Sequence, residues 1–140
     1  MVQEASNPSD KVLQAERTMP SPTQAWGWRI EAEAAEFLVE QGYRIVARNF
    51  RGGGGELDLV GWDDEVLCFI EVRARRTDRF GHPALTINRR KQQRIVRSAH
   101  AYLAKFRALP MTRFDVVAVV APDDDGRQFS LFKDAFEAGE

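Results

Sequence analysis

Hydrophobic positions recur along this chain first at helical spacing and then at strand spacing. From Gln24 to Gln41 the apolar side chains fall three or four residues apart, and Gly42 is well suited to end a helix. Five later stretches are apolar or alternating and are bounded by turn residues, which is typical of strands. They are Tyr43–Arg51, Glu56–Trp62, Val66–Ala74, Arg113–Val120 and, as a short edge strand, Phe129–Phe132.

A second amphipathic helix is predicted between the third and fourth strands. Asn88 is a good N-cap residue, and the apolar stripe that follows runs to about Phe106. The element order is therefore α-β-β-β-α-β-β. This order predicts an α/β fold in which helices flank a mixed central sheet on both faces.

The first 22 residues differ from the rest of the chain. Residues 1–22 are mostly polar and contain Pro8, Pro20 and Pro22. We expect a loosely ordered leader there, with one helical turn around residues 11–17, and a single domain over residues 23–140.

The amino-acid composition indicates the cellular compartment of the protein. Hydrophobic residues make up 44% of the chain and charged residues 29%. No apolar run approaches the ~20 residues of a membrane helix, and the N-terminus lacks the apolar segment of a secretory signal. The single cysteine, Cys68, lies in an apolar run and predicts a buried side chain. These features favour a cytoplasmic protein with no membrane partner.

The charge is distributed unevenly along the chain. The formal net charge is −1, yet residues 73–107 carry eleven basic residues and a single acid, Asp78. A basic segment of this kind suggests a polyanion such as nucleic acid as partner. A solvated, arginine-rich surface is the alternative interpretation.

Acidic residues occupy two neighbouring predicted strands. Glu56 and Asp58 are two positions apart and should share a face of the sheet. A turn at Asp63 and Asp64 would pair the next strand antiparallel and place Glu71 beside Asp58. Two carboxylates so close need a cation between them, and Mg²⁺ or Mn²⁺ prefers such oxygen ligands. Exposed acids paired with nearby arginines are an equally good explanation of the spacing.

Five segments together resemble the bacterial YraN-like family. They are "WGWRIEAEAAEFLVEQGYRIVARNFR", "GELDLV", "FIEVRARRTDRFGHPA", "RRKQQRIVRSAHAYL" and "RFDVVAV". That family looks like a member of the PD-(D/E)XK endonuclease-like fold, with likeness to Holliday-junction resolvases. The resemblance implies a restriction-endonuclease-like sheet and Mg²⁺- or Mn²⁺-dependent hydrolysis of phosphodiester bonds, with branched or structured DNA as substrate.

The resemblance also implies roles for particular residues. Asp58 and Glu71 match the metal-binding acids, Glu31 matches an acid that related resolvases bring from the first helix, and Glu56 matches the acid of the GE-x-D motif. Arg73 stands where the fold usually has a lysine. Arginine keeps its proton, so Arg73 can orient a phosphate but cannot act as a general base.

This departure leaves two alternatives beside the enzyme. One is a non-catalytic nucleic-acid-binding module of the same fold, and the other is a protein-interaction module that uses the basic face. In the non-catalytic case, Arg73 itself would neutralise Asp58 and Glu71. Likeness to resolvases, which act on two strands, makes a homodimer plausible.

The basic residues predict where a nucleic acid would bind. Cations at the start of the second helix oppose its dipole, and arriving phosphates would remove that conflict. Trp28 could stack on a base, whereas core packing is the better prediction for Trp26. The candidate nucleic-acid-binding residues are Arg75, Arg76, Arg79, Arg89, Arg90, Lys91, Gln92, Arg94 and Arg97.

Overall fold

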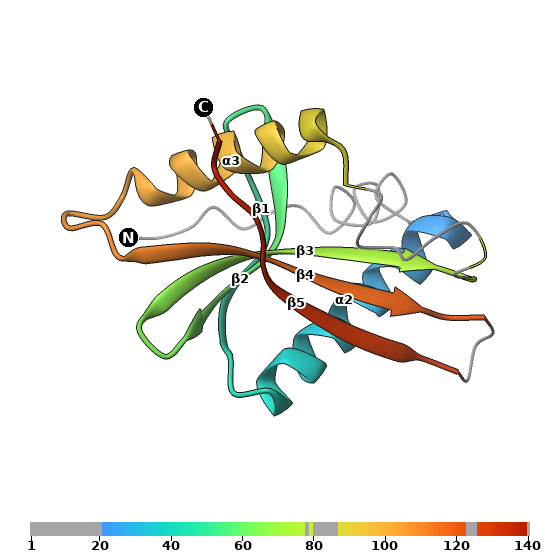
Figure 1. The fold of residues 1–140 in the computed structure, drawn as a ribbon. Coiled ribbons are helices and arrows are strands. Elements are labelled where there is room, and N and C mark those ends of the chain that lie inside the picture. Colours follow the sequence, from blue (N-terminus) through green and yellow to red (C-terminus); the bar gives the residue numbers. More distant parts are fainter. Residues whose placement is uncertain (1–20, 78, 80–86, 123–125, 140) are drawn as a thin grey trace, which may run out of the picture.

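A five-stranded mixed sheet with one helix on each face makes up the described part of the protein (Figure 1). The structure is a computed structural model that describes residues 21–77, 79, 87–122 and 126–139. The helices are α2 (Pro22–Glu40) and α3 (Arg89–Leu103). The strands are β1 (Arg44–Gly52), β2 (Gly55–Asp63), β3 (Val66–Arg75), β4 (Met111–Val120) and β5 (Gln128–Phe136).

The strands lie in the order β1-β2-β3-β4-β5, and the pairing is antiparallel except between β3 and β4. The parallel pair requires a crossover connection, and α3 provides it. The predicted α/β class and the order α-β-β-β-α-β-β are therefore confirmed, and the architecture is restriction-endonuclease-like. The expected helical turn in residues 11–17 lies outside the described residues.

Several element boundaries differ from the sequence-based predictions. The α3 helix ends at Leu103, three residues before the predicted Phe106, because Ala104 caps it. The edge strand β5 is longer than predicted and runs on to Phe136, where that ring stacks on Phe114 at 4.9 Å between centroids. Long-range packing of this kind leaves no local signal in the sequence.

Each face of the sheet has its own hydrophobic core. Under α2 the buried residues are Ile30, Ala34, Ala35, Leu38, Tyr43, Leu59, Cys68, Ile70, Val117, Val119 and Ala121. Under α3 they are Leu57, Val60, Leu67, Phe69, Ile87, Ile95, Val96, Ala99, Tyr102, Phe114 and Val116. Cys68 is fully buried as predicted, and burial raises the pKa of its thiol to about 12.

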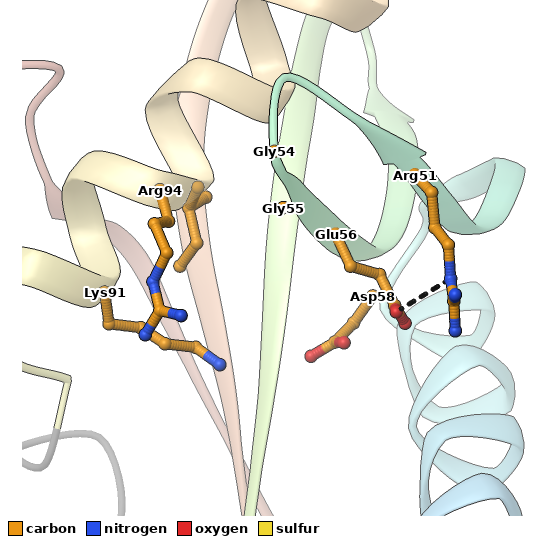
Figure 2. Close-up of a pocket in the computed structure, with 8 residues that line it drawn as sticks. Arg51, Gly54, Gly55, Glu56, Asp58, Lys91 and Arg94 are labelled. Carbon is orange, nitrogen blue, oxygen red and sulfur yellow. Dashed lines mark ion pairs between the residues drawn. The ribbon is translucent and has the colours of Figure 1, made fainter.

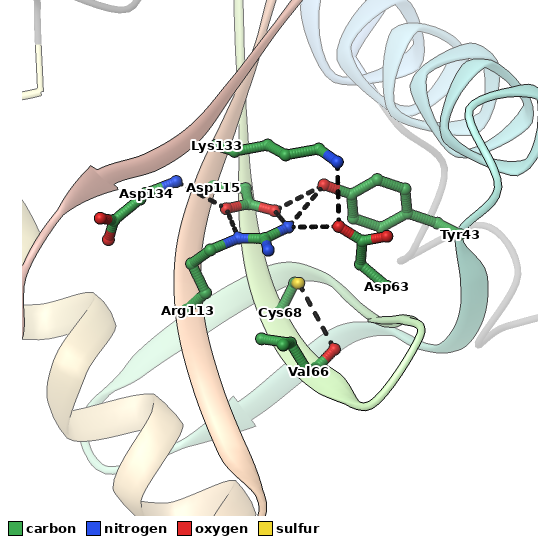
Figure 3. Close-up of polar contacts among 8 residues, drawn as sticks. All are labelled: Tyr43, Asp63, Val66, Cys68, Arg113, Asp115, Lys133 and Asp134. Atoms are coloured by element: carbon green, nitrogen blue, oxygen red, sulfur yellow. Dashed lines mark hydrogen bonds and ion pairs between the residues drawn. The ribbon is translucent and has the colours of Figure 1, made fainter.

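A buried polar network fastens β4 to the neighbouring strands (Figure 3). Asp115 is fully buried and accepts hydrogen bonds from Tyr43, from the Arg113 guanidinium and from the backbone N–H of Asp134. Arg113 also reaches Asp63 at 2.8 Å. Burial opposes the charge on Asp115, but these donors outweigh it and lower the pKa of the carboxyl. Asp115 therefore has a structural role, because groups of the protein itself satisfy its carboxylate.

The β1–β2 hairpin bends away from the sheet and its tip rests on α3 (Figure 1). Leu57 belongs to the core under α3 while Leu59 belongs to the core under α2. The alternation expected of a flat strand is therefore broken at Asp58. At the tip, Ser98 of α3 donates a hydrogen bond to the Gly52 carbonyl at 2.8 Å.

Two glycines at the hairpin tip test this docking. Gly53 and Gly54 both have positive φ, but a Cβ on Gly53 would lie 2.5 Å from the Arg97 carbonyl oxygen, whereas a Cβ on Gly54 meets nothing within 4 Å. We expect Gly54→Ala to cost about 1–2 kcal/mol from backbone strain alone. Gly53→Ala should cost a further ~1–3 kcal/mol through overpacking. Urea denaturation measures both, and equal losses would contradict docking of the tip on α3.

Candidate active site

Carboxylates from three elements meet where the hairpin bends. Beyond the pair Leu59 and Ile70, the backbone N–H of Val72 donates to Asp58 Oδ2 at 2.9 Å instead of to a strand carbonyl. This bond places Asp58 beside Glu71, the neighbour of Val72. The predicted approach of Asp58 to Glu71 is thus present in the structure.

Glu71 is almost fully buried, with 5% of its surface exposed. Burial is the main cause that raises the pKa of its carboxyl to about 9, and the charge and hydrogen bonding of Asp58 add to it. Lys91, whose Nζ lies 3.7 Å from Glu71 Oε1, acts in the opposite direction, as does Arg73. Burial beside another acid therefore favours the protonated form of Glu71.

Glu31 joins the cluster from α2. Burial raises the pKa of its carboxyl to about 7, with further contributions from Asp58 and Glu56. Asn49 connects two of these acids. With its amide nitrogen turned toward the carboxylates, Asn49 donates to Glu31 Oε2 at 2.9 Å and to Glu56 Oε1 at 3.1 Å.

The backbone of Asn49 is unusual for a residue within a strand, because its φ is +53°. Asparagine adopts this left-handed conformation more readily than most residues, and such conformations cluster at functional sites. Asn49 is not among the site residues predicted from the sequence, since nothing in the local pattern distinguishes it from any other polar strand residue.

A pocket of about 560 Å³ opens beside these acids (Figure 2). Its wall on the hairpin side includes Arg51, Glu56 and Asp58, and its wall on the α3 side includes Lys91 and Arg94. In Figure 2 the Asp58 carboxylate points into the space between Lys91 and Glu56. Arg51 lies 3.4 Å from Glu56 at the exposed rim. The pocket therefore carries two acids on the hairpin side, one of them paired with Arg51, and two cations on the α3 side.

The predicted basic residues separate into groups. Arg90, Arg94 and Arg97 are exposed on α3 and, with Gln93, line a second hollow of about 510 Å³ that shares Arg94 with the first pocket. Lys91 faces the acids instead, a placement that sequence spacing did not reveal because it depends on how α3 packs.

The remaining predicted binding residues lie apart from that hollow. Arg76 stacks on Trp26 with its Cζ 4.8 Å from the ring centroid, and Arg75 is half-buried at the end of β3. Gln92 donates to the Ile87 carbonyl at 3.0 Å, which fixes the entry to α3. Arg89 lines a separate hollow with Gln92, and the exposed Arg79 follows β3.

The acidic side chains of the site can be compared with the ligands that Mg²⁺ or Mn²⁺ prefers. In the described ranges, no group of three or more His, Cys, Asp or Glu side chains is arranged to hold a metal ion. Asp58 and Glu71 are two neighbouring carboxylates, and Mg²⁺ is commonly bound by one or two carboxylates with waters completing its shell. The residues present fit a hard, partly hydrated cation.

The architecture and this cluster define a class: an α/β protein of restriction-endonuclease-like fold with an acid cluster beside a basic helix. The chain belongs to the family described as Uncharacterised protein family UPF0102, which matches residues 30–119. A UPF0102 protein of Symbiobacterium thermophilum is 47% identical over 110 residues, which cover 77% of this chain and 92% of the relative. The family name itself carries no activity.

Further relatives extend the match. A UPF0102 protein of Chlorobaculum tepidum is 45% identical over 104 residues, with 74% of this chain and 81% of the relative covered. One of Desulfosudis oleivorans is 40% identical over 121 residues, with 86% and 96% covered. In the described part of the chain, neither helix is long and apolar enough to cross a membrane.

The raised pKa values predict how stability depends on pH. Because the folded chain holds protons on Glu71 and Glu31 up to about pH 9 and 7, while the unfolded chain releases them near 4.5, the free energy of unfolding should fall as pH rises through this range. We expect Glu71→Gln to flatten the fall and to stabilise the protein at about pH 9 by at least ~1.4 kcal/mol, equivalent to one pKa unit.

Urea denaturation in the presence of a chelator measures this dependence. Glu36→Gln is the matched control, because Glu36 is exposed on α2. It should leave the pH dependence unchanged. Parallel pH profiles for the unmodified chain and Glu71→Gln would contradict a proton held on Glu71.

Proposed function

We propose that this protein binds nucleic acid and hydrolyses phosphodiester bonds in branched or structured DNA, with Mg²⁺ or Mn²⁺ as cofactor. One observation carries the proposal: Asp58 lies beside the buried Glu71 and lines a pocket whose opposite side carries Lys91 and Arg94. The pKa of Glu71 stays raised although Lys91 lies 3.7 Å away, because burial and the charge of Asp58 outweigh that cation. A site for a metal and a phosphate needs both an acidic and a basic wall.

Asp58 and Glu71 would hold the cation, and the Val72 N–H fixes the orientation of Asp58. When bound, the metal would polarise the phosphate and lower the pKa of a water. Lys91 and Arg94 would contact the phosphate oxygens from the α3 side. Arg73 would stabilise developing negative charge, because its guanidinium stays positively charged. For the same reason it could not act as a general base.

The exposed arginines of α3 would bind the flanking backbone. Arg90, Arg94 and Arg97 line one hollow along the helix. Contacts from such residues go to phosphates, so they position a strand without reading its sequence. A homodimer would present two such sites to the two strands of a junction.

Metal binding gives the first test. In a titration with Mn²⁺, we expect the melting temperature to rise. A cation that binds only the folded chain stabilises it by about 2.7 kcal/mol when its free concentration is one hundred times its Kd. Asp58→Ala should abolish the rise, whereas Glu36→Ala should retain it. A rise that survives Asp58→Ala would place the cation elsewhere.

Cleavage and binding assays distinguish the enzyme from the non-catalytic module. The module is the second candidate because Arg73 stands where the fold usually has a lysine. We expect Mn²⁺-dependent cleavage of junction or flap DNA that Asp58→Ala removes. Arg94→Ala should weaken binding to all sequences and reduce the slope of log K against log salt by about 1. Salt-dependent binding without any cleavage would establish the module instead of the enzyme.

A further inference from the structure

Trp28 is the most exposed aromatic side chain in the part of the chain that the structure describes. It is 51% exposed, whereas Trp26, two residues earlier, packs partly against the core under α2. Tryptophan has one of the largest apolar surfaces of any side chain and is enriched at interfaces, where its ring contacts a partner. About half of the surface of Trp28 is therefore available to a ligand.

The position of Trp28 ties it to the acid cluster. Trp28 and Glu31 are three residues apart on α2, so their side chains are neighbours on one side of the helix, with about 4.5 Å between them along the axis. Glu31 is joined through Asn49 to Glu56 at the hairpin. Trp28 thus lies on the α2 side of the acids.

The cations lie on the other side. Lys91 and Arg94 belong to α3 and line the opposite wall of the pocket from Glu56. A nucleic-acid strand that places one phosphate at Asp58 would direct its backbone toward these cations. Its bases would then project away from α3, toward α2 and Trp28.

We propose that Trp28 stacks on an unpaired nucleobase next to the phosphate at the acid cluster, and so selects single-stranded segments over continuous duplex. The selection arises because each base inside a duplex is already covered on both faces, whereas a base in a flap, a branch point or a single strand offers a free face. This inference rests on the nucleic-acid binding proposed above, but it does not require cleavage.

Equilibrium binding with Ca²⁺ in place of Mg²⁺ or Mn²⁺ tests it, because Ca²⁺ also takes carboxylate oxygen ligands and keeps a cation between the acids and the phosphate. Gel electrophoresis of each recovered probe verifies that none has been cleaved. The probes are a fluorescently labelled oligothymidylate, a blunt duplex of the same length, and a strand of abasic sugar-phosphate units. We expect Trp28→Ala to weaken oligothymidylate binding by about 5- to 150-fold, the range for one stacked base. Binding to the duplex and to the abasic strand should change less than about twofold.

Two variants serve as controls. Trp28→Phe retains a ring and should recover most of the affinity for oligothymidylate. Val39→Ala removes another exposed apolar side chain, 56% exposed at the far end of α2, and should leave all three affinities unchanged. Melting temperatures verify that each variant folds.

The outcomes separate this inference from the enzyme proposal. Trp28-dependent binding in a protein that never cleaves would support the stacking site and refute hydrolysis. Equal losses for single strand and duplex, or no loss for either, would overturn the stacking site while leaving hydrolysis intact. An unmodified chain that binds neither oligonucleotide at low salt would overturn the stacking site as well.

Discussion

The hydrogen bond from the Val72 N–H to Asp58 is the interaction on which the site depends. It replaces a strand-to-strand bond at the point where the β2–β3 pairing ends, so a backbone donor stays satisfied while β2 leaves the sheet. Beyond this point the hairpin is free to bend toward α3, and Leu57 joins the opposite core from Leu59. The same bond that ends the ladder also sets Asp58 beside Glu71.

Two buried acids in this molecule have opposite environments. Asp115 is fully buried, but the Arg113 and Tyr43 side chains and a backbone N–H satisfy it, and the pKa of its carboxyl is lowered. Glu71 is nearly as buried, yet its neighbour is another acid and the pKa of its carboxyl is raised. Lys91 near Glu71 offsets only part of this cost, and strongly shifted pKa values of this kind cluster at functional sites.

Sequence reasoning predicted the order of the elements because local periodicity encodes them, and it predicted the approach of Asp58 to Glu71 because turn position sets the register of a hairpin. Contacts made across long separations were not predictable. Lys91 was assigned to the basic surface, whereas the packing of α3 turns it toward Glu71. Asn49 was missed because its significance lies in a positive φ and in partners on two other elements.

The start of α3 shows how the charges of the site fit together. Arg89, Arg90 and Lys91 occupy the first turn, which holds no acid, although cations there oppose the helix dipole. The buried carboxylate of Glu71 lies 3.7 Å from the Lys91 ammonium and so offsets part of this unfavourable interaction. Arg90 faces solvent, where an arriving phosphate would act in the same way. A helix that begins with cations is thus consistent with anions on both sides of it: a carboxylate that the protein provides and a phosphate that the substrate would provide.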